Sequence, residues 1–137
     1  MHAKTVRNRV GEKIWSSYFK FSIERNPWDR IVSSYLFRKK NEKLSFEAFL
    51  NKKHPNNWPI YTIDNRIVVD KLLKYENLEE SLMQTVAMLG VRPPGPLPRA
   101  KSGYRASRNY RDFYTEETAE LVRTRFANEV ATFGYTF

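Results

Sequence analysis

The chain has no cysteine, which excludes disulfide bonds, cysteine-ligated zinc sites and thiol catalysis. It also lacks any apolar run close to the roughly 20 residues that cross a bilayer. The segment from Met1 to Trp15 is polar and basic, without the apolar core that a signal peptide carries. We therefore expect a soluble protein, and these three absences favour a cytoplasmic location.

Histidine is scarce as well, with His2 and His54 the two present. His54 has no partner at the spacing that metal ligands share, so we expect no metal site and interpret His54 and Trp58 as anchors of a loop. Hydrophobic residues make up 41% of the chain and aromatic residues 15%, which indicates a folded protein with a real core. The length of 137 residues suits a single domain over residues 1–137.

Positive charge is in excess, with 24 basic and 15 acidic residues and a formal net charge of +9. The excess lies in residues 1–40 and 92–137, which flank a nearly neutral middle. A surplus of this size favours anionic partners, such as a nucleotide, a nucleic acid, a sulfated glycan or a lipid head group. The charge alone does not select among them.

Hydrophobic periodicity predicts a mostly helical chain with a few short strands. The expected helices cover residues 4–15, 27–40, 45–50, 78–89 and 116–133. Asn77 with Glu80 is expected to form a capping box, and Thr115 is expected to cap the last helix before Gly134 stops it. In the second helix, Trp28, Ile31, Val32, Tyr35 and Leu36 are expected to form the buried face.

The strand signals are shorter. Residues 18–23 alternate and are rich in aromatic side chains, which predicts a strand. Segments 60–63 and 67–73 are expected to pair as a hairpin across Asp64-Asn65. The remaining segments are expected to be irregular: a loop over 54–59, a proline-rich connector over 91–98 and a basic loop over 101–111.

The most informative stretch runs from Phe21 to Tyr35 and reads as a strand, a capped turn and a helix. Asn26 can cap the helix, and Pro27 suits its first position. Arg25 is placed at the carboxyl end of the strand, where ligands of open α/β sheets bind. Ser33 lies about two turns into the helix. A guanidinium group and a hydroxyl brought to one point would suit a terminal phosphate monoester.

This stretch, Arg-Asn-Pro-Trp-Asp-Arg-Ile-Val-Ser-Ser-Tyr from Arg25 to Tyr35, resembles the 3′-phosphate-binding motif of a known enzyme family. That family is the sulfotransferases that use 3′-phosphoadenosine-5′-phosphosulfate (PAPS). The resemblance implies that Arg25 and Ser33 contact the 3′-phosphate, and that Asn26, Pro27, Asp29 and Arg30 are structural. The alternative for Arg25 and Ser33 is an arginine at a helix start that pairs with Asp29 and a serine that faces solvent.

Further segments resemble the carbohydrate branch of the same family. They are Val69-Asp70, Tyr75-Glu76-Asn77-Leu78, Tyr110 to Tyr114, and Phe133 to Phe137. The resemblance implies an α/β, P-loop nucleotide-binding-like fold, PAPS as the donor and a hydroxyl of a carbohydrate as the acceptor. The family's first strand and its Pro-Lys-Thr/Ser-Gly loop, which holds the 5′-phosphosulfate, have no counterpart in this sequence. We therefore expect an N-terminally truncated fold that binds the donor weakly and turns over slowly by itself.

The sequence offers two candidates for the catalytic base. In glycan 2-O-sulfotransferases a candidate histidine precedes the motif by a distance similar to that between His2 and Arg25, so the resemblance makes His2 a candidate base. The alternative is a solvated histidine at the start of the chain. Glu24 is a second candidate, and its alternative is a strand residue paired with a nearby arginine.

Two further features have alternatives as well. The resemblance implies that Lys101, Ser102, Arg105 and Arg108 close over the donor's adenosine 3′-phosphate, whereas the alternative is a solvated basic loop. Trp28 and Tyr104 are candidates for stacking on the adenine, although Trp28 is better explained as a core residue.

A function from another class also fits the composition. A non-catalytic module that binds polyanions, either nucleic acid or sulfated glycan, would explain the charge of +9. Nucleic acid is not the expected partner of a sulfotransferase. An unpaired edge on the aromatic strand would favour a homodimer or a swapped dimer.

Overall fold

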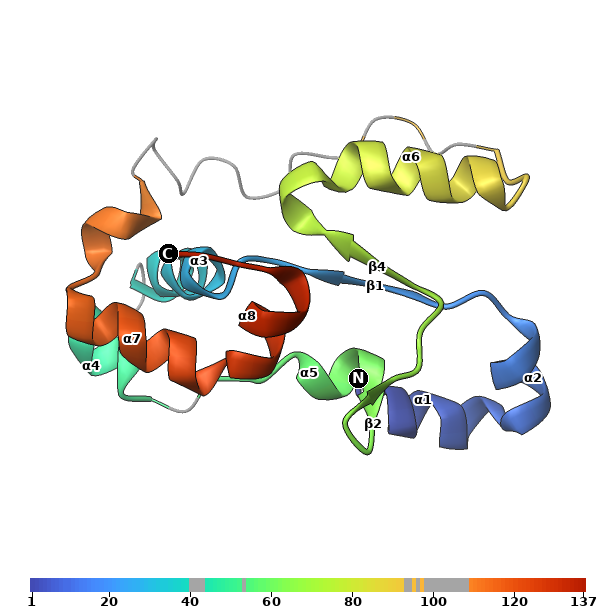
Figure 1. The fold of residues 1–137 in the computed structure, drawn as a ribbon, viewed down its shortest axis with the longest axis horizontal. Coiled ribbons are helices and arrows are strands. Elements are labelled where there is room, and N and C mark those ends of the chain that lie inside the picture. Colours follow the sequence, from blue (N-terminus) through green and yellow to red (C-terminus); the bar gives the residue numbers. More distant parts are fainter. Residues whose placement is uncertain (40–43, 53, 93–94, 96, 98–108) are drawn as a thin grey trace. The chain divides into compact units, whose positions relative to one another are not determined.

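The computed structural model describes residues 1–39, 44–52, 54–92, 95, 97 and 109–137 (Figure 1). The chain forms two compact units, each built from two separate stretches of sequence. Unit 1 comprises Met1–Glu24 and Asn56–Pro93, and unit 2 comprises Arg25–Pro55 and Pro94–Phe137. The single domain expected from the length stays a prediction, because compact units of one chain can belong to one domain.

In its described residues, unit 1 combines short helices with four short strands. In chain order its elements are α1 (Ala3–Val10), α2 (Glu12–Ser17), β1 (Phe21–Glu24), α5 (Trp58–Tyr61), β2 (Thr62–Ile63), β3 (Arg66–Ile67), β4 (Lys71–Lys74), the 3-10 helix η1 (Tyr75–Asn77) and α6 (Leu78–Met88). Strands β1 and β4 lie side by side and parallel, with Phe21 opposite Lys71 and Glu24 opposite Lys74 (Figure 1). Strands β2 and β3 form an antiparallel hairpin.

The hairpin confirms the expected turn, because Asp64 and Asn65 both adopt positive φ, at 48° and 60°. Asp and Asn tolerate this left-handed region better than other residues with a side chain. The hairpin is shorter than expected. Residues 67–73 do not form one arm of it, since β3 ends at Ile67 and Lys71–Lys74 pairs instead with β1.

Three other expectations for unit 1 are wrong. The helix expected over residues 4–15 is two helices, because Gly11 adopts φ 80° and ψ 160°, a conformation that ends α1. The expected loop over 54–59 contains the start of α5 at Trp58. Asn77 forms no side-chain cap on α6, since it already belongs to the 3-10 turn that precedes the helix.

Unit 2 is helical in its described part. Its elements are α3 (Pro27–Lys39), α4 (Phe46–Leu50), the 3-10 helix η3 (Tyr110–Phe113), α7 (Glu116–Arg125) and α8 (Ala127–Phe133). Ser45 caps α4 by accepting a hydrogen bond from the Ala48 N–H at 3.2 Å. Thr115 caps α7 as expected, in a reciprocal capping box with Thr118. The helix expected over 116–133 is interrupted at Phe126, whose φ of −118° and ψ of 35° are not helical.

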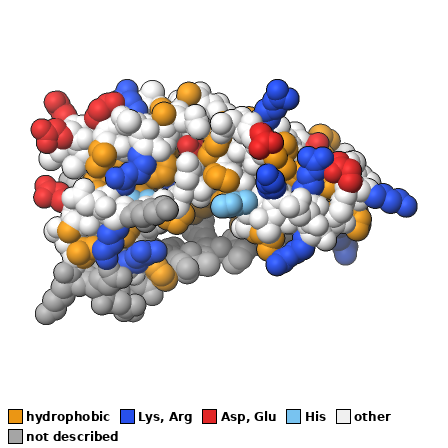
Figure 2. Space-filling view, turned by 90° about the horizontal axis from the view of Figure 1, so that it is seen from below, with side chains coloured by type: hydrophobic (Ala, Val, Ile, Leu, Met, Phe, Trp, Pro, Cys, Tyr) orange, Lys and Arg blue, Asp and Glu red, His pale blue; other side chains and the backbone are white. Residues whose placement is uncertain are grey.

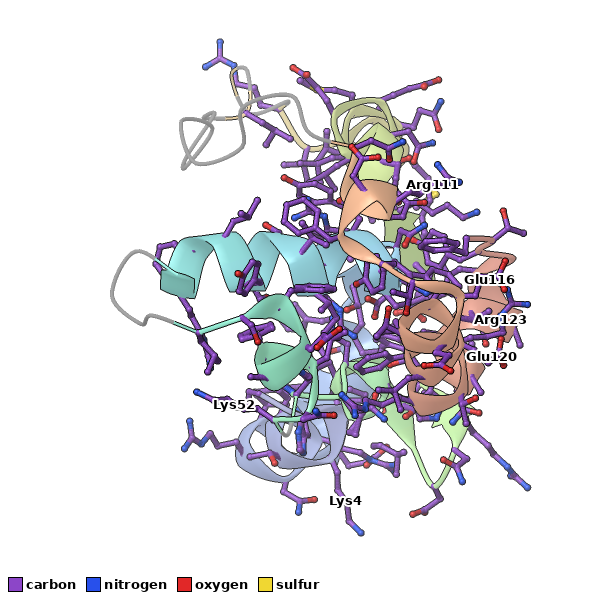
Figure 3. All side chains as sticks on the ribbon, turned by 90° about the vertical axis from the view of Figure 1, so that its left-hand side faces the viewer. Lys4, Lys52, Arg111, Glu116, Glu120 and Arg123 are labelled. Carbon is purple, nitrogen blue, oxygen red and sulfur yellow. The ribbon has the colours of Figure 1, made fainter. Side chains whose placement is uncertain are left out.

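The core of unit 2 is aromatic. Its buried members are Trp28, Ile31, Tyr35, Phe49, Leu50, Ala119, Val122 and Phe126. The indole N–H of Trp28 donates to the Ala119 carbonyl at 2.9 Å, and the Tyr114 hydroxyl donates to the Trp28 carbonyl at 2.9 Å. These bonds join α3 to the C-terminal part of the chain, and they satisfy the polar atoms of the buried Trp28 and the half-buried Tyr114 side chains. Glu129 on α8 is completely buried, whereas Glu120 pairs with Arg123 at 3.1 Å on the outer face of α7 (Figure 3).

The observed architecture is therefore mixed α/β, mostly helical with a few short strands, which confirms that part of the expected fold class. Within the residues that the structure describes, no helix has the length and apolar character needed to cross a membrane.

Candidate functional site

The start of α3 is built by local sequence. The Asn26 side-chain oxygen accepts hydrogen bonds from the N–H groups of Trp28 at 3.0 Å and Asp29 at 3.3 Å. Pro27, at the first helical position, has no N–H to satisfy. The Arg30 N–H donates to the Asn26 carbonyl at 2.9 Å. The backbone donors of this first turn are thus engaged within the protein, so an anion bound here would have to be held by side chains.

Arg25 directly precedes this cap. Its Nε donates to Asp29 Oδ2 at 2.6 Å, and its Nη2 reaches the same oxygen. The side chains of Arg25 and Asp29 are 18% and 14% exposed. This pair is the alternative that the sequence left open for Arg25. The pair also fixes the orientation of the guanidinium group, which a binding site requires.

Ser33 follows Asp29 by four residues, on the same helix. Residues at this spacing share one face, about 6 Å apart along the axis. Asp29 and Ser33 thus lie on one side of α3, and Arg25, which precedes the helix, pairs with Asp29. We call these three residues the Arg25–Ser33 face. Ser33 is half-buried there, while Ile31 and Val32 are buried on other sides of the helix.

The Arg25–Ser33 face carries hydrogen-bond donors of the kind that a terminal phosphate requires. A guanidinium group offers several donors in a planar fork, and the serine hydroxyl adds another. The dipole of the 13-residue helix α3 also favours negative charge near its N-terminus. Asp29 opposes the binding, because its carboxylate is a second anion that competes for Arg25. The residues therefore fit a phosphate group that exchanges with Asp29 as the partner of Arg25.

Glu24 lies at the carboxyl end of β1 and is completely buried. Its carboxylate accepts hydrogen bonds from the Tyr61 hydroxyl at 3.1 Å and from the Asn57 side-chain amide at 3.2 Å. Both partners belong to the same unit as Glu24. This environment anchors β1 to α5 and the preceding turn, and the burial leaves the carboxylate no open path to an acceptor.

His2 is exposed and immediately precedes α1, where its side chain makes no capping hydrogen bond. A general base is normally oriented by a hydrogen-bonding partner. In the part of the chain that the structure describes, no such partner holds the His2 ring. Its role as a base stays a prediction.

The four expected residues of the basic loop, Lys101, Ser102, Arg105 and Arg108, lie outside the described residues, as does Tyr104. Trp28 is a core residue with no exposed surface, so the expectation that favoured the core is confirmed over adenine stacking. Trp58 anchors its loop as expected, because its indole N–H donates to Asn65 Oδ1 at 3.2 Å.

His54 also anchors a loop, through a 2.9 Å hydrogen bond between its Nε2 and the Phe49 carbonyl. Partial burial is the main cause that lowers the pKa of His54 from its ordinary value of 6.5. The positive charges of Arg125, Arg38 and Arg30 lower this pKa further, and the bond to Phe49 opposes them. His54 is therefore a neutral structural residue at physiological pH.

A groove of unit 1 is lined by residues to which the sequence alone assigned no binding or catalytic role. They are Arg7, Ile63, Asp64, Arg66 and Val68. They come from α1 and from the hairpin, which are about 60 positions apart in the sequence. The one signal that could have identified part of the lining is the Asp64-Asn65 turn, which predicts the hairpin.

Comparison with known proteins finds a family match over nearly the whole chain. A family model described as "Sulfotransferase family" matches residues 2–136. An uncharacterized protein of Archaeoglobus fulgidus is 40% identical over 100 residues, which cover 66% of this chain and 83% of that protein. No solved structure matches the chain.

Proposed function

Because the chain belongs to the sulfotransferase family, we propose that it binds PAPS and transfers the sulfuryl group to a hydroxyl of a carbohydrate. Family membership by itself indicates a transferase that moves a sulfuryl group to an acceptor hydroxyl. Family membership does not identify the donor or the acceptor, so PAPS as the donor and a carbohydrate hydroxyl as the acceptor are part of the proposal.

The Arg25–Ser33 face is the observation that carries the proposal. It combines a guanidinium group, oriented by Asp29 just before α3, with the hydroxyl of a serine on that helix. PAPS differs from most adenine nucleotides by a phosphate monoester on the 3′-oxygen. A site made of a charged fork and a hydroxyl supports recognition of that group.

The proposed roles of the residues follow from this chemistry. Arg25 and Ser33 bind the 3′-phosphate and so orient the donor for in-line transfer. Lys101, Ser102 and Arg105 would close over the donor, and His2 would take the proton of the acceptor hydroxyl. The expected fold around them is P-loop-like. The leaving 5′-phosphate needs positive charge nearby, and the sequence shows no Pro-Lys-Thr/Ser-Gly loop to supply it. We therefore expect this chain alone to bind PAPS weakly and to turn over slowly.

The second candidate is a non-catalytic module for polyanions, which the net charge of +9 favours. Among the described side chains on the face drawn in Figure 2, however, basic ones are interspersed with acidic and hydrophobic ones. Affinity for a polyanion should grow with its length and fall steeply with salt. A nucleotide site should instead distinguish ligands by where their phosphates are attached.

Substitutions on the Arg25–Ser33 face test the proposal. Arg25→Ala should weaken binding of adenosine 3′,5′-bisphosphate by roughly 2–4 kcal/mol, because a charge-assisted fork is lost. Ser33→Ala should weaken it by roughly 1 kcal/mol, because a single neutral hydrogen bond is lost. Binding of 5′-AMP should change little. Isothermal titration calorimetry with both nucleotides measures these differences.

Arg38→Ala is the matched control, because Arg38 is exposed and lies on the same helix. It removes the same charge and should leave the affinities for both nucleotides unchanged. Equal losses for the bisphosphate and for 5′-AMP in Arg25→Ala would refute the assignment of the 3′-phosphate site. An equal loss in Arg38→Ala would favour the polyanion module.

A further inference from the structure

Helix α2 buries none of its residues. Its neighbour α1 packs against α5 and β2, whereas α2 packs mainly against α1. Ile14 on α2 is 48% exposed, and Tyr18, which ends this helix, is 68% exposed. Val10, at the end of α1, is 37% exposed. Two successive helices thus leave apolar side chains in water, so burial against a partner would be favourable.

The same two helices carry an excess of positive charge. Residues 1–20 contain five basic side chains and one acidic side chain. Lys4, Arg9 and Lys13 are exposed and form no ion pair with any residue that the structure describes. Lys4 extends away from the ribbon (Figure 3), and Figure 2 shows basic side chains beside hydrophobic ones over α1 and α2. A partner that covers these helices must therefore match positive charge as well as apolar groups.

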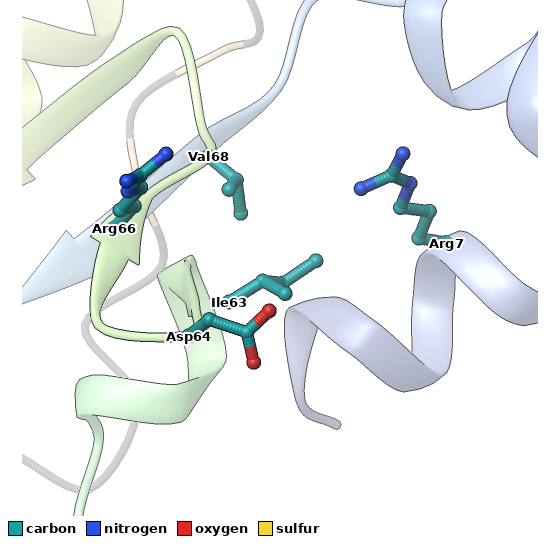
Figure 4. Close-up of a pocket in the computed structure, with 5 residues that line it drawn as sticks. All are labelled: Arg7, Ile63, Asp64, Arg66 and Val68. Carbon is teal, nitrogen blue, oxygen red and sulfur yellow. The ribbon is translucent and has the colours of Figure 1, made fainter.

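Arg7 is a fourth basic residue of these helices, and it extends from α1 into a groove shared with the β2–β3 hairpin (Figure 4). It pairs with Glu12 at 2.7 Å, but these two side chains are 42% and 63% exposed. Such an exposed pair contributes little stability, so an anion of the partner can replace Glu12. The fifth basic residue, Lys20, is engaged within unit 1, because it pairs with Asp70 at 2.8 Å.

We propose that these helices dock the protein on a membrane whose lipid head groups are anionic, through a surface that we call the α1–α2 surface. It comprises Lys4, Arg7, Arg9, Val10, Lys13, Ile14 and Tyr18. The basic side chains bind anionic head groups, and the apolar ones enter the boundary between head groups and acyl chains. A tyrosine suits this boundary, because its ring is apolar and its hydroxyl is polar. The proposal goes beyond sulfuryl transfer and does not depend on the Arg25–Ser33 face.

The combination of charge and exposed aliphatic groups favours a lipid surface over other partners. A nucleic acid or a sulfated glycan offers anions, but it has no apolar phase to receive Val10 and Ile14. A second copy of the chain would bring the same positive charge to the contact, and like charges oppose association. An anionic membrane supplies both the negative charge and the apolar phase.

Cosedimentation of the full chain with lipid vesicles tests the proposal. One set of vesicles contains phosphatidylcholine alone, and the other contains about 30% phosphatidylserine as the anionic lipid. In about 0.1 M salt the protein should bind the anionic vesicles about tenfold or more tightly, because several basic side chains contact charged head groups. Equal affinity for both sets, or binding to neither, would overturn the proposal.

Two substitutions on α2 separate charge from apolar burial. Lys13→Gln should weaken binding to the anionic vesicles about fivefold, because one basic contact is lost. Ile14→Ser should weaken it about fivefold as well, because an inserted apolar side chain is lost. Both positions are exposed, so neither substitution removes a buried contact. An Ile14→Ser variant that binds as tightly as the wild type would refute insertion into lipid and would favour a soluble polyanion as the partner.

Arg38→Gln and Leu121→Ser are the matched controls. Arg38 is exposed on α3, Leu121 is 38% exposed on α7, and both belong to unit 2. Each control should leave the vesicle affinity within about twofold, because neither residue belongs to the α1–α2 surface. Losses equal to those of Lys13→Gln and Ile14→Ser would overturn the α1–α2 surface in favour of net charge and general hydrophobicity.

Glu12→Gln should strengthen binding to the anionic vesicles about fivefold. It removes the one acidic side chain among residues 1–20 and releases Arg7. A gain of affinity cannot result from damaged folding, and an unchanged or weaker affinity would contradict the proposal. These measurements use no nucleotide, so their outcome is independent of the titration that tests the Arg25–Ser33 face.

Discussion

Arg25 has one observed partner, the Asp29 carboxylate in the first turn of α3, and one proposed partner, the phosphate of the donor. With Asp29 as the partner, the guanidinium group is oriented before any ligand arrives, which lowers the entropy cost of binding. The carboxylate also weakens binding, because it must give up its bond to Arg25 or share it. A site of this kind gains specificity for a strongly charged group such as a phosphate monoester over weaker anions.

Capping residues are the part of the site that the sequence predicts well. Asn26 and Thr115 cap their helices as expected, because a cap depends on contacts within a few residues. The same local logic fails at Asn77, where a 3-10 turn takes the place of the cap. The burial of Glu24 could not be predicted, since its partners Asn57 and Tyr61 lie more than 30 positions away.

His54 gives a prediction at this scale. Its pKa in the folded protein lies below its unfolded value, mainly because of burial. The unfolded state therefore binds a proton more readily, and the stability from neutral His54 is lost as the pH falls below about 6.5. The unfolding free energy of the wild type should decline between about pH 8 and pH 5 more steeply than that of His54→Asn. Urea denaturation at each pH measures both slopes, and parallel slopes would contradict the assignment.

Among the elements, the predicted helices are the more reliable part. The buried stripe of α3 is confirmed for Trp28, Ile31, Val32 and Tyr35, because the 3.6-residue period requires no knowledge of the partner. The pairing of β1 with β4 was missed. Its strands are 4 residues long and 50 positions apart, so no local signal joins them. The breaks at Gly11 and Phe126 depend on backbone angles that periodicity does not encode.

The break between α1 and α2 gives a prediction for elements. Gly11→Ala should lower the unfolding free energy by about 1–2 kcal/mol, since a side chain disfavours φ near 80°. No atom lies within 4 Å of the added Cβ, so the effect comes from the backbone alone. Gly95→Ala is the control, because Gly95 has equal space and no positive φ in the left-handed region. Thermal or chemical unfolding compares the two, and equal effects would show that the break does not depend on the conformation of Gly11.

At the scale of the whole molecule, the net charge and the exposed side of strand β1 are the features that a single element does not explain. The charge of +9 arises from both units, so it does not define a site by itself. The sheet of unit 1 is small, since in the described part of the chain β1 pairs only with β4. Phe21 and Ile23 on β1 are 43% and 41% exposed. Exposed apolar strands with an unpaired side recruit other strands.

We therefore expect the chain to self-associate through β1. Ile23→Lys should reduce this association, because a charged residue on an edge strand opposes pairing. Ile14→Lys is the control, since Ile14 is 48% exposed on α2 and belongs to no strand. Static light scattering over a concentration series reports the mass. A wild type that stays monomeric, or equal effects of the two variants, would contradict a β1 interface.

Recognition of the 3′-phosphate is the central claim, and one titration tests it most directly. Adenosine 3′,5′-bisphosphate and adenosine 2′,5′-bisphosphate carry the same charge and differ only in which ribose oxygen bears the phosphate. Calorimetry on the wild-type chain should show the 3′,5′ isomer binding about tenfold or more tightly, because the contacts proposed for Arg25 and Ser33 select the position of the phosphate. Equal affinities would show that the chain responds to charge alone and would contradict the assignment of the Arg25–Ser33 face.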